Sequence, residues 1–112
     1  MKNFKIKKED IKKIIDDNSA CIVSDEILIN GKSVGYMYRE KPSESYNDSG
    51  WRFFAGDETK ESCDNPDNFS IVELNTLCNY DGSVVKKLSS DIGTAYKRNK
   101  RGYFVKEKLQ DR

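Results

Sequence analysis

The segment from Gly50 to Ala55 constrains the fold more than any other part of this chain. Side chains alternate between the two sides of a β-strand, so a strand here places Trp51 and Phe53 on one side and Arg52 and Phe54 on the other. Because aromatic side chains occupy both sides, we expect both faces of this strand to be at least partly covered. The sequence therefore predicts a strand that holds the core.

Asn30-Gly31 gives the strongest local turn signal. This dipeptide tolerates positive φ at both central positions of a tight turn, which predicts an antiparallel hairpin between Ile27–Ile29 and Ser33–Arg39. In the second strand of this hairpin, the two predicted faces carry Val34, Tyr36 and Tyr38 on one side and Gly35, Met37 and Arg39 on the other. A second hairpin is predicted from Gly93–Tyr96 and Gly102–Val105, with a basic tip between them.

Apolar residues at helical spacing predict three helices. Ile11, Ile14 and Ile15 indicate an N-terminal helix from Glu9 to Asp17. Two shorter helices are predicted at Ile71–Cys78 and Ser83–Leu88, the latter capped by Asp81 or Ser83. The polar segments Glu40–Ser49 and Gly56–Asn68 are expected to be loops. The predicted fold class is α+β, a single small domain over residues 1–112 whose mostly antiparallel sheet packs against these helices.

The chain of 112 residues contains no histidine. Histidine is the usual general base near neutral pH, so its absence excludes Ser-His-Asp and Cys-His catalysis and Cys/His zinc sites. Cys21, Cys63 and Cys78 show no paired spacing and are expected to be reduced thiols. With no apolar run of membrane-spanning length and no signal sequence, we expect a cytoplasmic protein that does not enter a membrane.

Charge is sorted along the chain although the net charge is only +1. Residues 1–13 contain six Lys and two acids, residues 40–82 contain ten acids and three bases, and residues 86–112 contain nine bases and three acids. The basic ends can fold back over the acidic middle, which is one interpretation. The other is that the acidic middle faces a basic partner, since opposite charge accelerates encounter and selects against wrong partners. A nucleic-acid site on the basic tip, Lys97–Arg101, has no recognised binding motif behind it.

Individual side chains in the acidic middle each have a structural and a functional interpretation. Asp57, Glu58, Glu61 and Asp64 form a carboxylate cluster that could be solvated surface, bind a divalent cation or contact a basic partner. Trp51 is interpreted either as a core anchor, with its indole N–H bonded to a loop carbonyl, or as an interface anchor. Arg39 and Arg52 are expected to form ion pairs with carboxylates such as Asp48 or Asp57.

Seven motifs follow one another along the chain in a characteristic order, namely Val23-Ser24-Asp25, Val34-Gly35-Tyr36-Met37-Tyr38-Arg39-Glu40, Asp48 through Glu58, Asn65-Pro66-Asp67-Asn68, Leu74-Asn75-Thr76, Asn79-Tyr80-Asp81 and Ile92-Gly93-Thr94-Ala95-Tyr96. Together they resemble the bacterial DUF2185 family, also called the Imm33 immunity-protein family. The resemblance covers about residues 21–96 and leaves the Lys-rich N-terminal segment outside. It implies a small cytoplasmic protein that binds and neutralises a toxin, and not an enzyme. The toxin is expected to be a basic, nuclease-like domain.

The sequence thus leads to two sets of candidate residues and no catalytic, metal or cofactor site. The expected partner-binding residues are Glu44, Tyr46, Asp48, Trp51, Arg52, Asp57, Glu58, Glu61 and Asp64. The expected structural signature is Arg39, Gly50, Trp51, Phe53, Gly56 and Gly93. The alternative function is a small-ligand or divalent-cation-binding protein that uses the acidic loop at Asp57 and Glu58.

Overall fold

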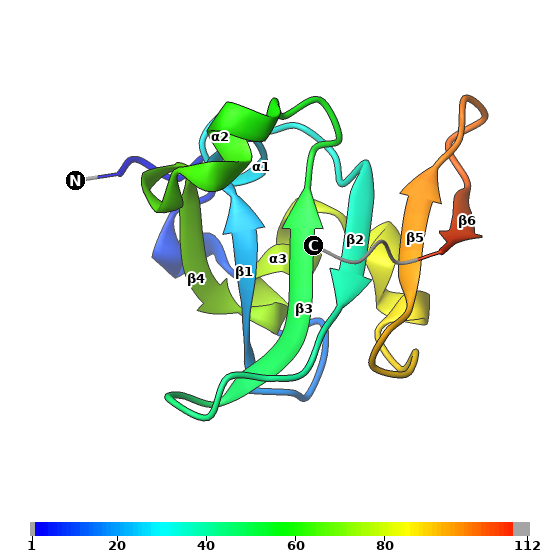
Figure 1. The fold of residues 1–112 in the computed structure, drawn as a ribbon. Coiled ribbons are helices and arrows are strands. Elements are labelled where there is room, and N and C mark those ends of the chain that lie inside the picture. The colour runs from blue at the N-terminus through cyan, green and yellow to red at the C-terminus, as the bar shows by residue number, and fades with distance from the viewer. Residues whose placement is uncertain (1, 109–112) are drawn as a thin grey trace.

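Six strands form one sheet in the order β4-β1-β3-β2-β5-β6 (Figure 1). A computed structural model describes residues 2–108. The strands are β1 (Ala20–Ser24), β2 (Tyr36–Arg39), β3 (Asp48–Phe54), β4 (Phe69–Glu73), β5 (Ala95–Arg98) and β6 (Phe104–Glu107). Neighbouring strands are antiparallel except β1 and β3, which are parallel. The predicted α+β class with a mostly antiparallel sheet is confirmed.

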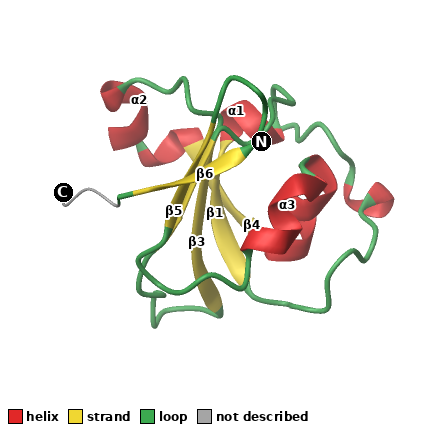
Figure 2. Cartoon of the chain, turned by 90° about the vertical axis from the view of Figure 1, so that its right-hand side faces the viewer, coloured by secondary structure: helices red, strands yellow, loops and turns green. Residues whose placement is uncertain are grey.

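Short helices lie on both faces of this sheet (Figure 2). They are α1 (Asp25–Leu28), α2 (Lys60–Asp64) and α3 (Leu74–Tyr80), with 3₁₀ helices η1 (Lys8–Asp10), η2 (Pro66–Asn68) and η3 (Gly82–Lys87). Helix α3 covers one face, which we call the α3 face, and α2 lies over one end of the opposite face, the α2 face. The main hydrophobic core lies on the α3 face, where Trp51, Phe53 and Leu77 are fully buried.

Strand β3 has the two covered faces that its sequence predicts. All seven of its residues are buried. Trp51 and Phe53 belong to the core on the α3 face, whereas Phe54 belongs to a second cluster with Tyr38 on the α2 face. The rings of Tyr38 and Phe54 stack with centroids 5.8 Å apart. The predicted strand is confirmed for Gly50–Phe54, with each aromatic residue on its predicted side. It begins earlier than expected, because Asp48 and Ser49, predicted to belong to the loop Glu40–Ser49, lie in β3, and it ends before Ala55.

The predicted helix from Glu9 to Asp17 is wrong, because only the short turn η1 forms there. The segment after η1 bonds to α3 instead of to itself. Asn75 accepts the backbone N–H groups of Ile14 and Ile15 and donates to the carbonyl of Lys12, while Asn79 accepts the N–H of Lys12. These side-chain amides occupy backbone groups that a helix would use, so the chain runs along α3 as an extended arm.

The hairpin predicted at Asn30-Gly31 is also wrong. The preceding residues form α1, which begins where the Ser24 side chain accepts the N–H of Glu26. Gly31 does have positive φ, 75°, but it closes this helix, and its N–H donates to the carbonyl of Ile27. Asn-Gly serves a helix end as well as a turn, because both need positive φ. Strand β2 pairs with β3 and β5 instead, with Tyr36 and Tyr38 on one face and Met37 on the other as predicted. The predicted side of Val34 is wrong, because this residue precedes β2 and is buried in the main core with Met37.

The remaining predictions are correct in part. Ile71 lies in β4, and the helix predicted at Ile71–Cys78 begins only at Leu74. The expected loop Gly56–Asn68 contains α2 and η2. Asp81 caps η3 as predicted, accepting the N–H of Ser83. The second hairpin forms as β5 and β6, each starting two residues later than expected.

Candidate partner-binding surface

The α2 face carries the residues that alternate with the core. Paired strands place Ile22 opposite Arg52 and Ile71, Arg52 opposite Tyr38, Phe54 opposite Tyr36, and Tyr36 opposite Lys97. Directly paired residues share a side of the sheet, so these side chains form one continuous surface. Ile71 and Val105 lie exposed on the two outer strands of this surface. The α2 face is therefore aromatic at its centre and more exposed toward its edges.

A buried ion-pair cluster stands on this face. Arg52 donates from Nη1 and Nη2 to the two carboxylate oxygens of Asp48, at 2.9 and 2.7 Å, and from Nε to Glu40 at 2.6 Å. Arg52 and Asp48 are both buried, whereas the Glu40 side chain is 47% exposed. The predicted ion pair between Arg52 and Asp48 is confirmed, and its geometry is bidentate.

A bulge in β3 brings Asp48 and Arg52 together. The pairing with β1 advances by two residues on β1, from Ala20 to Ile22, but by four on β3. Strand β3 therefore carries two more residues than β1 here, and Gly50 lies within this stretch. Gly50 has φ 87°, and a Cβ at this position would lie 2.2 Å from the carbonyl oxygen of Glu40. Only glycine fits this position.

The pKa of Asp48 shows which effect dominates in the cluster. Burial raises the pKa of this carboxyl, but the hydrogen bonds from Arg52 and from the N–H groups of Ser43 and Gly50 outweigh burial and hold the pKa at about 2. The carboxylate is therefore stabilised in its charged form. Asp48, predicted as a partner contact, is thus engaged with Arg52 inside the protein.

Trp51 and Arg39 lie at the end of β2 and β3 on the α3 side. Trp51 is fully buried, and its indole N–H donates to the carbonyl of Leu88 at 3.2 Å, which confirms the interpretation as a core anchor. The guanidinium of Arg39 lies 5.8 Å from the Trp51 ring centroid and donates to the carbonyls of Ser49 and Ser90. The predicted pair of Arg39 with Asp48 or Asp57 is wrong: within residues 2–108 its guanidinium forms no ion pair, and backbone oxygens accept its hydrogen bonds.

Gly93 and Gly56, two other residues of the expected structural signature, lie beside β2 and β3. Gly93 donates its N–H to the carbonyl of Arg39 at 2.6 Å. Gly56 follows β3 and packs against Gly35, with a Cβ at Gly56 lying 3.4 Å from the Gly35 Cα. The signature residues therefore lie in or beside β3 and its connections to β2.

The acidic segment at the other end of β3 divides into engaged and unengaged carboxylates. Asp57 pairs with Lys32 at 2.7 Å, which lowers the pKa of Asp57, and Glu58 accepts the N–H groups of Ala55 and Gly56. These contacts engage Oδ2 of Asp57 and both carboxylate oxygens of Glu58, which a cation site at these residues would need. Glu61 and Asp64 are exposed on α2 and form no ion pair with any residue between 2 and 108.

No group of three or more potential metal ligands occurs among residues 2–108. The carboxylates of the acidic segment therefore form no such group.

The basic hairpin contributes one of its charged side chains, Arg98, to internal contacts. The Arg98 guanidinium donates to Asp81 at 2.8 Å and to the carbonyl of Val34 at 2.7 Å, and it lies 4.1 Å from the Phe104 ring centroid. Arg98 is therefore a structural residue of the sheet.

The two loops expected to bind a partner lie at opposite ends of β3 (Figure 1). Glu44 is exposed and Tyr46 half-buried in the loop between β2 and β3, whereas Asp57 to Asp64 follow the other end of the strand. Seven residues of strand separate these loops by roughly 20 Å. A partner that contacts both loops would therefore have to span the length of β3.

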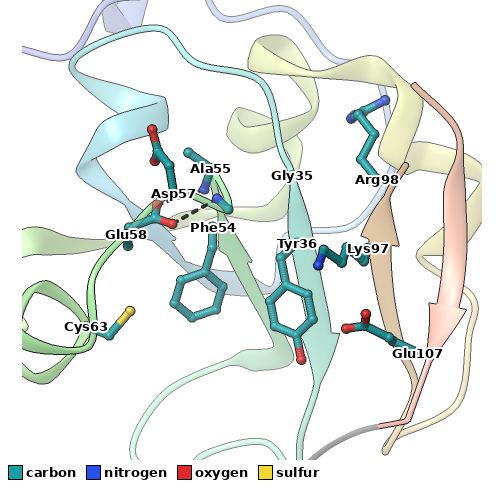
Figure 3. Close-up of a pocket in the computed structure, with 11 residues that line it drawn as sticks. Gly35, Tyr36, Phe54, Ala55, Asp57, Glu58, Cys63, Lys97, Arg98 and Glu107 are labelled. Carbon is teal, nitrogen blue, oxygen red and sulfur yellow. Dashed lines mark hydrogen bonds between the residues drawn. The ribbon is translucent and has the colours of Figure 1, made fainter. Parts of the chain in front are cut away.

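A hollow of about 530 Å³ opens beside β2 on the α2 face (Figure 3). Tyr36 and Phe54 form its floor, Cys63 of α2 lies on one side, and Lys97 and Glu107 lie on the other. None of these five residues belongs to the candidate set that the sequence predicts. Strand alternation shows which of them share a face, but the pairing of β2 with β5 that gathers them is a long-range property.

The family comparison decides what kind of protein this is. Residues 21–108 match the model of the Imm33 immunity protein domain. The chain belongs to this family. The match extends the predicted resemblance, about residues 21–96, to the C-terminal hairpin. Comparison with curated proteins and with solved structures gave no match.

The Imm33 match begins in β1 and includes β2 to β6, so it contains both the Arg52 cluster and the hollow. The extended arm that Asn75 and Asn79 hold lies before the matched region. No helix within residues 2–108 of this Imm33 protein is long and apolar enough to span a bilayer. Membership of the Imm33 family thus supports an immunity function directed against a toxin.

Proposed function

We propose that this Imm33 protein binds a cognate bacterial toxin and neutralises it by protein–protein contact, in the cytoplasm and without catalysis. The family match is the observation that carries the proposal. The unengaged carboxylates support it. Glu44, Glu61 and Asp64 are exposed and form no ion pair within residues 2–108. Carboxylates in this state can pair with a basic partner without first breaking an internal contact.

The contact surface in this proposal is the α2 face with the loops at its two ends. Trp51 is completely buried on the opposite side and Arg52 is held by Asp48, so both support the surface from inside. The contacts come from the exposed side chains of Glu44, Asp57, Glu61 and Asp64 and from the half-buried side chains of Tyr46 and Glu58. A nuclease-like toxin fits this surface, since a protein that binds polyanionic nucleic acid has a basic cleft that an acidic face complements.

Co-purification with the products of neighbouring genes tests the proposal. We expect one toxin-like product to form a one-to-one complex whose affinity, measured by calorimetry, falls as salt rises from 0.05 to 0.5 M, an interval chosen around about 0.1 M, where the Debye length is roughly 10 Å. The double variant Glu61→Lys/Asp64→Lys should weaken the complex. The control Glu9→Lys/Asp10→Lys makes the same charge change in η1 and should not. If no neighbouring product binds, or if both double variants bind equally well, the proposal fails.

A further inference from the structure

We propose that the hollow between Tyr36, Phe54 and Glu107 seats an arginine side chain of the toxin. This inference rests on the proposed function and names the group that the α2 face recognises. It adds Tyr36, Phe54 and Glu107, which lie outside the acidic loops, and it gives the contact a specific anchor. Interfaces usually depend on a few such anchors, among which Arg is one of the most frequent.

The floor of the hollow suits a planar cation. The rings of Tyr36 and Phe54 lie 5.9 Å apart at 45°, and Tyr36 is only half-buried. A guanidinium stacks on such rings and is more weakly hydrated than a lysine ammonium, so it loses less on leaving water. The volume of about 530 Å³ accommodates a long side chain.

Carboxylates line the hollow beside this aromatic floor. Glu107 is exposed, points toward Tyr36 in Figure 3, and has no ion pair within the described part of the chain, residues 2–108. Asp57 and Glu58 line the same hollow from the loop after β3. A guanidinium on Tyr36 could pair with Glu107 in the planar two-bond geometry that Arg–carboxylate pairs adopt.

Two basic residues also line the hollow, but only one of them competes for it. The Arg98 guanidinium is turned away, since it binds Asp81 and stacks on Phe104. Lys97 is exposed and points toward Tyr36 without an ion pair among residues 2–108. The bound arginine would take the place of its ammonium group. Removing the charge of Lys97 should therefore strengthen binding, which is the opposite of what an acidic ligand would show.

Charge exchange at these two positions tests the inference with the toxin that co-purifies with the wild-type protein. We expect Glu107→Lys to weaken the complex about tenfold or more, as for loss of one partner of an interfacial charge pair. Lys97→Glu should tighten it about threefold, the size expected of an exposed charge. Lys106→Glu is the matched control. It makes the same charge change on the neighbouring strand β6, where Lys106 pairs with Tyr96 on the opposite face of the sheet. It should leave the affinity closer to wild type than Lys97→Glu does.

Two further measurements complete the test. Tyr36→Leu keeps apolar volume but removes the ring, and we expect about a fivefold loss of affinity, within the range of a cation–π contact. Replacing each arginine of the toxin in turn by Lys should identify one whose loss makes the toxin insensitive to Glu107→Lys. If Lys97→Glu weakens binding, if Lys97→Glu and Lys106→Glu act alike, or if no toxin arginine couples to Glu107, the inference is overturned while toxin binding stands. If no toxin binds wild type, both proposals fall.

Discussion

Replacing Asp48 by Asn changes one atom in the centre of the Arg52 cluster. The Oδ1 position can still accept from Gly50 N–H at 3.0 Å and from Arg52 Nη1 at 2.9 Å. The Oδ2 position accepts from Ser43 N–H at 2.8 Å and from Arg52 Nη2 at 2.7 Å, and in the variant it becomes an NH₂ donor facing two donors. Among residues 2–108, the substitution therefore leaves the buried guanidinium with Glu40 as its only carboxylate partner.

The expected loss of stability is about 3 kcal/mol at neutral pH, the lower end of the range for breaking a buried ion pair, because Glu40 still holds Nε. Part of this loss depends on pH. The pKa of Asp48 is about 2 in the folded protein against 3.8 unfolded, a difference that contributes about 2 kcal/mol. Since the folded pKa is the lower one, this contribution is complete above pH 3.8 and is lost as pH falls toward 2.

Urea denaturation of wild type and Asp48→Asn from pH 7 down to pH 2 measures both effects. The difference in free energy of unfolding between the two proteins should be largest at neutral pH and should decrease by about 2 kcal/mol as the pH approaches 2. Glu40→Gln is the control. Its side chain is 47% exposed and makes one bond, so it should cost less than about 1 kcal/mol. A gap below about 1 kcal/mol at pH 7 for Asp48→Asn, or one that does not vary with pH, would refute this account of the cluster.

Three other perturbations follow from the geometry. Gly50→Ala adds a left-handed penalty to a clash of 2.2 Å with the Glu40 carbonyl and should destabilise by about 3 kcal/mol or more in urea denaturation, whereas Gly82→Ala, with open space around it, should change stability by less than about 1 kcal/mol. Asn75→Ala removes three hydrogen bonds to the N-terminal arm and should speed amide hydrogen exchange at Ile14 and Ile15 without exposing β3. Unchanged exchange rates at these two residues would show that Asn75 does not hold the arm. Cys63, half-buried on α2, should react with a thiol reagent long before the two core cysteines, whose thiol pKa values are raised by burial, and mass spectrometry showing more than one fast site would contradict this.

Local sequence was sufficient to predict the structure where a segment bonds to residues near it in the chain, or where the alternation of side chains along a strand determines which face each residue takes. The sides of Trp51, Phe53 and Phe54 followed from the period of a strand, and the cap at Asp81 followed from a short-range bond. The N-terminal helix failed for the opposite reason. Ile14 and Ile15 have helical spacing, but their N–H groups bond to Asn75, about 60 residues away, which no local pattern records.

The candidate site was predictable to a similar extent. The pair between Arg52 and Asp48 could be expected from their chemistry, although the bulge at Gly50 that makes it bidentate could not. The acidic residues at the two ends of β3 were found from charge alone. Their separation by the α2 face, and the hollow that Tyr36 and Glu107 line there, depend on which strands pair and so lay beyond a reading of the sequence.

Trp51 and Arg52 are adjacent in sequence but lie on opposite faces of the same central strand. If β3 slipped by one residue against β1 and β2, the guanidinium would enter the apolar core without a carboxylate, and the indole would lose its bond to Leu88. Every such slip is penalised on both faces at once. The Trp-Arg pair therefore selects one alignment of the sheet during folding, and it disfavours the misaligned pairings from which aggregates of β-rich proteins begin.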